Sequence, residues 1–312
     1  MRYFTFLLAL VIIISAPFFG QVPIDFNNLS NPETVDYKLF WDIRLPRVIV
    51  AFFAGAILAL GGLLFQSLFK NPMGTPYTLG VASGSTLGVA FAIVFGFPSM
   101  VSLFGFFGAL FTVIVLFTLT VKLKSYETNA LLLVGIALAF FYNAALMILF
   151  YLSDESQSFE IIRFTMGSVD VVGLEKTLPI FFSSIALLLL AHLYKKELKL
   201  LLTSNNYAYL KGVDVKKVNT ILLVAVSVAV GVCVSLTGPI GFVGLIIPHI
   251  VKSIYKKSAE QLILPIFFYG GVFLVISDLI SRNIGVNTDL PIGIITAFLG
   301  GPFFIYLIIR RR

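Results

Sequence analysis

Few residues in this chain of 312 are of types that do chemistry, and they do not combine into a familiar catalytic site. There is one cysteine, and the two histidines, His192 and His249, lie far apart with no His-Glu-x-x-His motif around them. No Gly-Lys pair occurs, so the Walker A phosphate loop is missing and ATP hydrolysis by that route is excluded. Ser83 and Ser85 could supply an intramembrane nucleophile, but small residues that let helices approach closely explain them better.

Acidic groups that could couple transport to protons are also scarce. The apolar stretches are nearly free of ionisable residues at their centres, and the nearest one, Asp278, lies close to the outer end of its stretch. A proton-coupled carrier usually needs such groups at mid-membrane. We therefore expect the energy for any transport to come from another subunit.

The composition is that of a membrane protein. Hydrophobic residues make up 59% of the chain and charged residues only 12%, about half the share of a soluble domain. Cys233 has no second cysteine with which to form an intramolecular disulfide. The net charge of +7 is weak evidence for nucleic-acid binding, because membrane proteins concentrate lysine and arginine on one side of the bilayer.

The hydropathy pattern predicts an all-α polytopic membrane protein with about ten spans in a single transmembrane domain, residues 1–312. A bilayer core about 30 Å thick needs about 20 apolar residues per helix. The expected spans are 3–20, 46–69, 78–97, 100–121, 129–152, 178–194, 219–237, 240–251, 262–280 and 291–309. The eighth is short and contains Pro248, so we expect neighbouring helices to shield it from lipid.

The distribution of basic residues predicts the orientation. With both termini in the cytoplasm, sixteen of the 22 lysines and arginines fall on the inner side, which is the expected bias. The first span could instead be read as a signal peptide, but Pro17-Phe18-Phe19-Gly20 is a poor cleavage context and we expect the span to be retained. The connections 21–45 and 153–177 are then external, and 195–218 is the longest cytoplasmic connection.

Two segments rich in proline and glycine interrupt the apolar pattern. They are Asn71-Pro72-Met73-Gly74-Thr75-Pro76 and Gly238-Pro239-Ile240-Gly241. Their unpaired backbone groups are tolerated at membrane depth only inside protein or beside a wet cavity. Both segments are therefore candidates for a gate or a pore lining.

Several short motifs in a fixed order resemble one known family. They are Arg44-Leu45-Pro46-Arg47, Asn71-Pro72-Met73, Gly80-Val81-Ala82-Ser83-Gly84, Gly238-Pro239-Ile240-Gly241-Phe242-Val243-Gly244-Leu245, Pro248-His249, Asp278 with Arg282, Leu290-Pro291-Ile292-Gly293 and Gly300-Gly301-Pro302-Phe303-Phe304. Together they resemble the FecCD-type permease of ABC importers for iron–siderophore, haem and cobalamin. The resemblance runs from about residue 40 to the C-terminus.

The resemblance implies a type II ABC importer permease fold in a bacterial or archaeal cytoplasmic membrane. It implies a second permease subunit, identical or a sister chain, two separate ATPase subunits that use ATP, and an external substrate-binding protein. It implies no cofactor or metal bound by this chain, and no nucleic-acid partner.

The resemblance also assigns roles to residues on the outer face. Arg44, Arg47 and Arg282 would meet acidic residues of the binding protein, and arginine suits this role because its fork grips a carboxylate with two bonds. Two other uses remain open. Arg44 and Arg47 could anchor the span at the lipid interface, and Arg282 could pair with Asp278 four residues away.

The path and its cytoplasmic gate are assigned in the same way. Asn71, Pro72 and Met73 would narrow the inner end of the path, and Thr128 and Asn129 would form a second constriction. The loop 125–129 contains Glu127, where the family is usually more basic. Polar residues expected on the path walls are Gln66, Ser67, Ser83 and Ser85.

The long cytoplasmic connection would contact the ATPase. Its segment from Tyr207 to Asp214 resembles the family's A-x-x-L-G-V motif, with Lys211 inserted between leucine and glycine. The residues assigned to coupling are Ala208, Leu210, Gly212, Val213 and Asp214. A solvated basic loop would have a similar composition.

The sequence thus predicts an importer permease for a metal chelate, a ferric siderophore in the first place. Haem and cobalamin are alternatives within the family. A stand-alone secondary carrier would need an ion site, and an intramembrane enzyme would need a paired acid and base; neither is found in the sequence.

Overall fold

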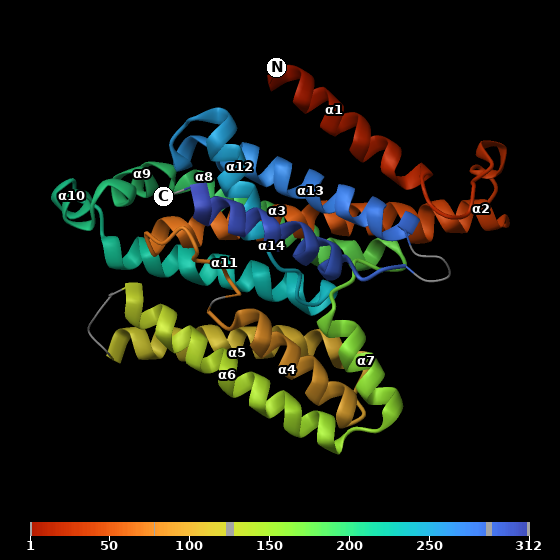
Figure 1. Ribbon diagram of the computed structural model, residues 1–312, viewed down its shortest axis with the longest axis horizontal. Coiled ribbons are helices and arrows are strands. Elements are labelled where there is room, and N and C mark those ends of the chain that lie inside the picture. The colour runs from red at the N-terminus through yellow and green to blue at the C-terminus, as the bar shows by residue number, and fades with distance from the viewer. Residues whose placement is uncertain (1, 78, 123–127, 285–288, 311–312) are drawn as a thin grey trace.

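The chain folds into helices that run side by side between two ends of the molecule (Figure 1). The computed structural model describes residues 2–77, 79–122, 128–284 and 289–310, and these residues contain no β-strand. The α-helices are α1 (Arg2–Ser15), α2 (Val35–Lys38), α3 (Leu45–Leu68), α4 (Val81–Val94), α5 (Val101–Lys122), α6 (Thr128–Leu152), α7 (Glu155–Thr165), α8 (Leu178–Leu193), α9 (Lys195–Thr203), α10 (Asn205–Leu210), α11 (Val215–Thr237), α12 (Val243–Tyr255), α13 (Ile263–Ile284) and α14 (Ile292–Arg310). The predicted all-α membrane fold is confirmed.

The apolar helices lie where the spans were predicted. Among the described residues, six helices are long and apolar enough to cross a membrane, and four shorter apolar helices lie in the first, third, eighth and tenth predicted spans. The exact number of crossings and the side of each terminus stay predictions. One boundary differs, because a π-helical turn over Leu39–Arg44 joins α2 to α3 and extends this helix outward.

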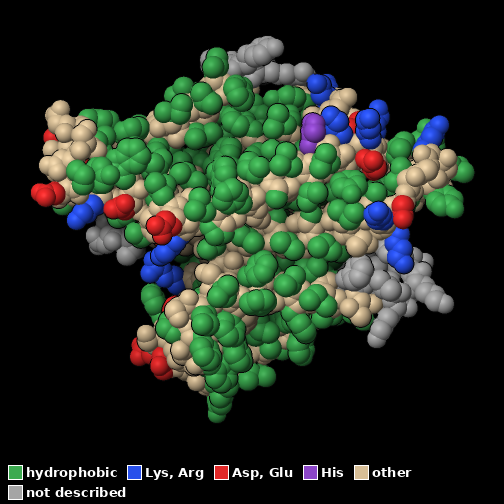
Figure 2. Space-filling model, turned by 180° about the vertical axis from the view of Figure 1, so that it is seen from behind, with side chains coloured by type: hydrophobic (Ala, Val, Ile, Leu, Met, Phe, Trp, Pro, Cys, Tyr) green, Lys and Arg blue, Asp and Glu red, His purple; other side chains and the backbone are tan. Residues whose placement is uncertain are grey.

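The two ends of the bundle are chemically distinct from its middle. On the face that Figure 2 shows, hydrophobic side chains cover most of the surface between the ends, while charged side chains gather towards the ends. Figure 1 places α9 and α10 at one end and α2 and α7 at the other. By the predicted orientation these are the cytoplasmic and outer ends, and we use those names below.

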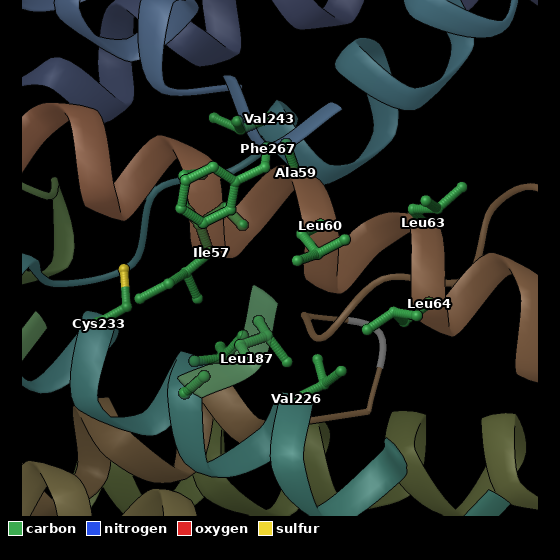
Figure 3. Close-up of a cluster of buried hydrophobic side chains, with 14 of the residues drawn as sticks. Ile57, Ala59, Leu60, Leu63, Leu64, Leu187, Val226, Cys233, Val243 and Phe267 are labelled. Carbon is green, nitrogen blue, oxygen red and sulfur yellow. The ribbon is translucent and has the colours of Figure 1, made fainter. Parts of the chain in front are cut away.

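Helix α3 lies at the centre of the core, as Figure 3 shows. Most of its residues are buried, and it packs against α13, α12, α11 and α8. Two glycines allow the closest approaches: a Cβ on Gly62 would overlap the backbone of Gly244 in α12, and one on Gly55 would overlap the backbone of Gly270 in α13. Because these helices touch through their backbones, the residue type at each contact is fixed by space.

Helices α4, α5 and α6 form a second group that packs on α11 (Figure 1). A smaller core joins this group to α7; its buried members are Val89, Ala90, Ile93, Leu149 and Ile161. Helix α12 is only 13 residues long, and its first six residues are buried. The expectation that neighbours shield this short span is confirmed.

Candidate translocation path, outer face and coupling surface

Arg44 is buried at the outer end of the molecule, with 4% of its surface exposed. Its guanidinium donates to the backbone oxygens of Phe18 at 3.2 Å and Val22 at 2.5 Å. These bonds hold the connection after α1 against the start of α3. The prediction that Arg44 contacts a binding protein stays untested, and its partners here lie within its own chain.

Arg47 lies at the centre of a cluster of three carboxylates. Its Nε donates to Asp278 at 2.7 Å, and its Nη1 lies 2.5 Å from both Asp170 and Asp289. The side chain of Asp278 is fully buried, whereas those of Asp170 and Asp289 keep about a third of their surface exposed. A buried carboxylate requires a cation and hydrogen bonds nearby, and Arg47 supplies both.

Arg282 supplies the second cation for Asp278. The two residues are four apart on α13, and Arg282 Nη2 lies 2.9 Å from Asp278 Oδ2. The guanidinium also donates to the backbone oxygens of Phe19 and Ala16 at 3.4 and 3.5 Å. The pairing of Arg282 with Asp278 that the sequence left open is therefore present, and docking by Arg282 stays a prediction.

Sequence analysis assigned no role to Asp170 and Asp289. Both lie in irregular connections, where neither motif spacing nor helical periodicity indicates a partner. The one sequence signal that could have indicated these two residues is the surplus of acidic residues in the outer connections. An arginine buried in an apolar span needs acidic partners, and these connections are where the partners occur.

Gln66 is buried between α3 and α12, and its place on the path stays a prediction. Its side chain is 5% exposed, and its Nε2 donates to the backbone oxygen of Gly244 at 3.0 Å. Pro248 lies four residues beyond Gly244 and has no N–H, so this oxygen lacks its partner within α12. Gln66 therefore completes the hydrogen bonding of a helix interrupted by proline, and Lys252 Nζ lies 3.4 Å from its Oε1.

We expect Gln66→Leu to lower the free energy of unfolding by about 1–3 kcal/mol, because it leaves the buried oxygen of Gly244 without a donor. The measurement is thermal unfolding of the purified chain in detergent. Ser67→Ala is the matched control, because the Ser67 hydroxyl bonds only to Leu63 within its own helix. Equal effects of the two substitutions would contradict the role of Gln66.

The connection after α3 makes a tight turn beside a cavity. The side-chain Oδ1 of Asn71 accepts a hydrogen bond from the N–H of Met73 at 2.9 Å, and the backbone oxygen of Asn71 accepts one from the N–H of Gly74 at 3.0 Å. Asn71 and Pro72 are half-buried, and this turn exposes the side chain of Met73. Met73 borders a cavity of about 370 Å³, which is lined by Leu58, Met73, Thr75, Pro76, Tyr77, Gly241, Phe242, Gly244, Leu245 and Phe304.

Phe242 is a cavity residue that sequence reasoning did not single out. Its φ of +66° is uncommon for a residue with a side chain. Its ring packs directly on Gly300 of α14, where a Cβ would overlap it. Such a backbone conformation persists only when the surroundings fix it, and it is found more often at functional sites.

The remaining predicted path residues lie elsewhere. Ser83 is half-buried and Ser85 is fully buried, and neither lines the cavity of 370 Å³. Helix α6 begins at Thr128, but the side chains of Thr128 and Asn129 and the whole of 125–127 lie outside the described residues. The second constriction therefore stays a prediction.

The cytoplasmic segment forms a short helix with a well-defined end. The N–H of Gly212 donates to Tyr209 and that of Val213 donates to Ala208, at 2.9 and 3.1 Å. This is the Schellman pattern, with Lys211 as the cap residue and Gly212 at a φ of +82°. Lys211, between leucine and glycine, is thus the cap residue of the helix end, and the register in which this segment meets an ATPase stays a prediction.

The same segment presents two large side chains to solvent. Tyr209 is 74% exposed and Leu210 81%, whereas Ala208 is fully buried in the core. The side chain of Asp214 accepts from the N–H of Lys217 at 3.0 Å and caps α11. Ala208 and Asp214 therefore have structural positions, and the exposed tip of α10 is the surface available to a partner.

We expect Gly212→Ala to increase hydrogen exchange at the Val213 amide about fivefold, because left-handed backbone costs alanine about 1 kcal/mol. The measurement is exchange mass spectrometry on the purified chain. Asp214→Ala is the control, since it should affect the Lys217 amide and leave Val213 unchanged. Equal acceleration at both amides in both variants would contradict this assignment.

These features define the class of the protein: an all-helical membrane protein with an apolar cavity beside the turn 71–74 and large exposed side chains at the tip of α10. The sequence pattern of the FecCD transport family matches residues 7–310. The chain therefore belongs to the FecCD transport family.

Individual relatives cover nearly the whole chain. The hemin transport system permease protein HmuU of Yersinia pestis is 30% identical over 99% of this chain and 95% of that protein. The vitamin B12 import system permease protein BtuC of Vibrio vulnificus is 31% identical over 98% and 93%, respectively. A solved structure of a metal-chelate type ABC transporter in an inward-facing conformation superposes with a TM-score of 0.89 at 27% identity, over 99% of this chain and 98% of that chain.

The protein is thus the permease subunit of an ABC importer, in which ATP is hydrolysed by a separate subunit. It is a multi-pass protein of the cytoplasmic membrane.

Proposed function

We propose that this permease forms the path for a metal chelate, a ferric siderophore in the first place. The observation that carries the proposal is the apolar cavity of about 370 Å³ beside the turn 71–74. The described residues that line it include no acid or base, and Met73, Tyr77 and Phe242 present soft or aromatic surfaces. Such a wall suits a bulky chelate that must pass without being held tightly.

Haem and cobalamin are the alternative cargoes. They are supported by the relatives named for hemin and vitamin B12. Membership of the FecCD family speaks against a stand-alone secondary carrier.

The proposed complex contains two permease subunits, two ATPase subunits and an external binding protein. ATP is bound by the ATPase subunits, and this chain itself holds no cofactor. The exposed tip of α10, with Tyr209 and Leu210, is the proposed ATPase contact. Gly212, Val213 and Asp214 support this contact by fixing the end of α10 and the start of α11.

The binding protein is proposed to dock on the outer end that carries Arg44, Arg47 and Arg282. Because all three guanidinium groups are buried and bonded to groups of their own chain, we propose that they act mainly by fixing the outer connections to which the binding protein binds.

The test is uptake of radiolabelled iron by a deletion strain and its complemented twin, with several ferric siderophores and with labelled haem and cobalamin as separate arms. Loss of uptake confined to one ferric siderophore supports the proposal, and loss confined to haem or cobalamin would identify that compound as the cargo instead.

Complementation of the deletion strain with Leu210→Glu tests the proposed ATPase contact. Because Leu210 is exposed, the variant should reach the membrane in normal amounts and yet fail to restore uptake; restored uptake would contradict the ATPase contact.

A further inference from the structure

Segments that are distant in sequence converge on one side chain at the outer end. Arg47 belongs to α3 and Asp278 to α13, whereas Asp170 lies in the connection after α7 and Asp289 lies three residues before α14. One guanidinium nitrogen, Arg47 Nη1, lies 2.5 Å from both Asp170 and Asp289. The pair α3–α13 is therefore joined by ion pairs to two separate connecting segments.

The partners of Arg47 differ in their access to water. Asp278 is fully buried and has a second cation in Arg282, so it fixes the position of the Arg47 side chain. Asp170 and Asp289 are each about one-third exposed and border a cavity of about 470 Å³ at the outer end. Water can therefore replace Arg47 at these two carboxylates at a smaller cost than at Asp278.

The same two segments are in direct backbone contact. A Cβ on Gly293, at the start of α14, would overlap the backbone oxygen of Met166. The N–H of Gly173 donates to the oxygen of Asp42 at 2.8 Å, which ties the other end of the 166–173 connection to the helix that leads into α3. Asp170 also has a second cation within reach, because Arg163 on the surface of α7 lies 3.9 Å away.

We propose that Asp170 and Asp289 are positioning residues of the outer gate, and that with Arg47 they form an ion-pair latch. The latch holds the connection after α7 and the start of α14 together over the outer end of the path, and its ion pairs to the two partly exposed carboxylates break when the path opens outward. The inference rests on the proposed function. It agrees with the close superposition on an inward-facing transporter, in which the outer end is expected to be closed.

The test is a reversible disulfide across the latch in the reconstituted importer. The native cysteine, Cys233, is buried, so Asp170→Cys combined with Asp289→Cys introduces the reactive thiols. Oxidation, or a short bis-methanethiosulfonate linker, should lower transport at least tenfold while ATP hydrolysis stays within twofold, and a reductant should restore transport. The two single-cysteine variants should not respond. Normal transport by the cross-linked protein, or failure to cross-link with either reagent, would overturn the latch.

A second measurement does not depend on the cargo or on the double variant. Met166 borders the same cavity and is 39% exposed, so Met166→Cys reports on access to the gate. A membrane-impermeant thiol reagent should label this cysteine at least threefold faster when Asp289→Asn is added, measured without nucleotide. An unchanged rate would overturn the latch even if the cargo proves to be different, whereas faster labelling with no uptake of any chelate would contradict only the proposed function.

Discussion

Arg47→Met is expected to lower the free energy of unfolding by about 3 kcal/mol or more, because removing one partner of a buried ion pair leaves the other uncompensated. The substitution keeps the apolar stem of the side chain but leaves Asp278, which is fully buried, with Arg282 alone. Asp170 and Asp289 lose less, since water reaches both of them. The measurement is the temperature at which half of the detergent-solubilised chain loses its monodisperse gel-filtration peak.

Arg163→Met is the matched control for this experiment. Arg163 is also an outer arginine near Asp170, but its side chain is 67% exposed and 3.9 Å from that carboxylate. Its loss should cost at most about 0.5 kcal/mol. A similar loss of stability in both variants would show that the burial of the Arg47 cluster is not what stabilises the outer end. Because Arg47 is buried beside Asp278, we expect an acidic residue at this position to unfold the outer end. Such a variant would therefore not measure docking of the binding protein.

Gly62→Ala is expected to destabilise the protein by about 3 kcal/mol, although alanine is the better helix former. A Cβ at this position would overlap the backbone of Gly244, so α3 and α12 would have to separate or shift. Separation would also break the hydrogen bond from Gln66 to Gly244. Thermal unfolding in detergent measures the loss of stability. Because Gly244 of α12 lines the cavity of about 370 Å³, a shift of α12 would also change the shape of this cavity, and reduced uptake is a second expected result.

Gly61→Ala, the adjacent residue of the same helix, is the control. A Cβ there would lie 3.1 Å from a methyl group of Val226, which needs to move only a few tenths of an ångström. The gain of about 1 kcal/mol in helix propensity offsets much of that cost. A larger loss for Gly61→Ala than for Gly62→Ala would refute the claim that backbone contact with α12 sets the effect.

The sequence predicted the membrane fold well because its signals are local. Apolar runs and basic residues at their ends are read from short windows, and the helices lie where these windows indicated. The extension of α3 through Leu39–Arg44 was missed, because Pro46 reads as the start of a helix. In the structure the Asp42 oxygen, which Pro46 cannot bond, accepts instead from Gly173, which is far away in sequence.

The site was less predictable because its geometry depends on contacts between distant segments. The sequence placed Arg47 and Arg282 at the outer end, but it could not show that both turn inward to Asp278. Gln66 was expected on the path because it is a polar residue in a span, yet its partner is an oxygen left unpaired by Pro248. The proline-rich turn that exposes Met73 is a local signal, and Met73 borders a cavity; its role in narrowing the path stays a prediction.

The bond between Gln66 and Gly244 also has an evolutionary consequence. The amide of Gln66 is needed because Pro248 lacks an N–H, so the value of one residue depends on the identity of the other. If alanine replaced Pro248, its own N–H could satisfy the Gly244 oxygen, and selection on position 66 would relax. We therefore expect the two positions to depend on each other, so that the amide of Gln66 can be lost at a smaller cost once the proline has been replaced.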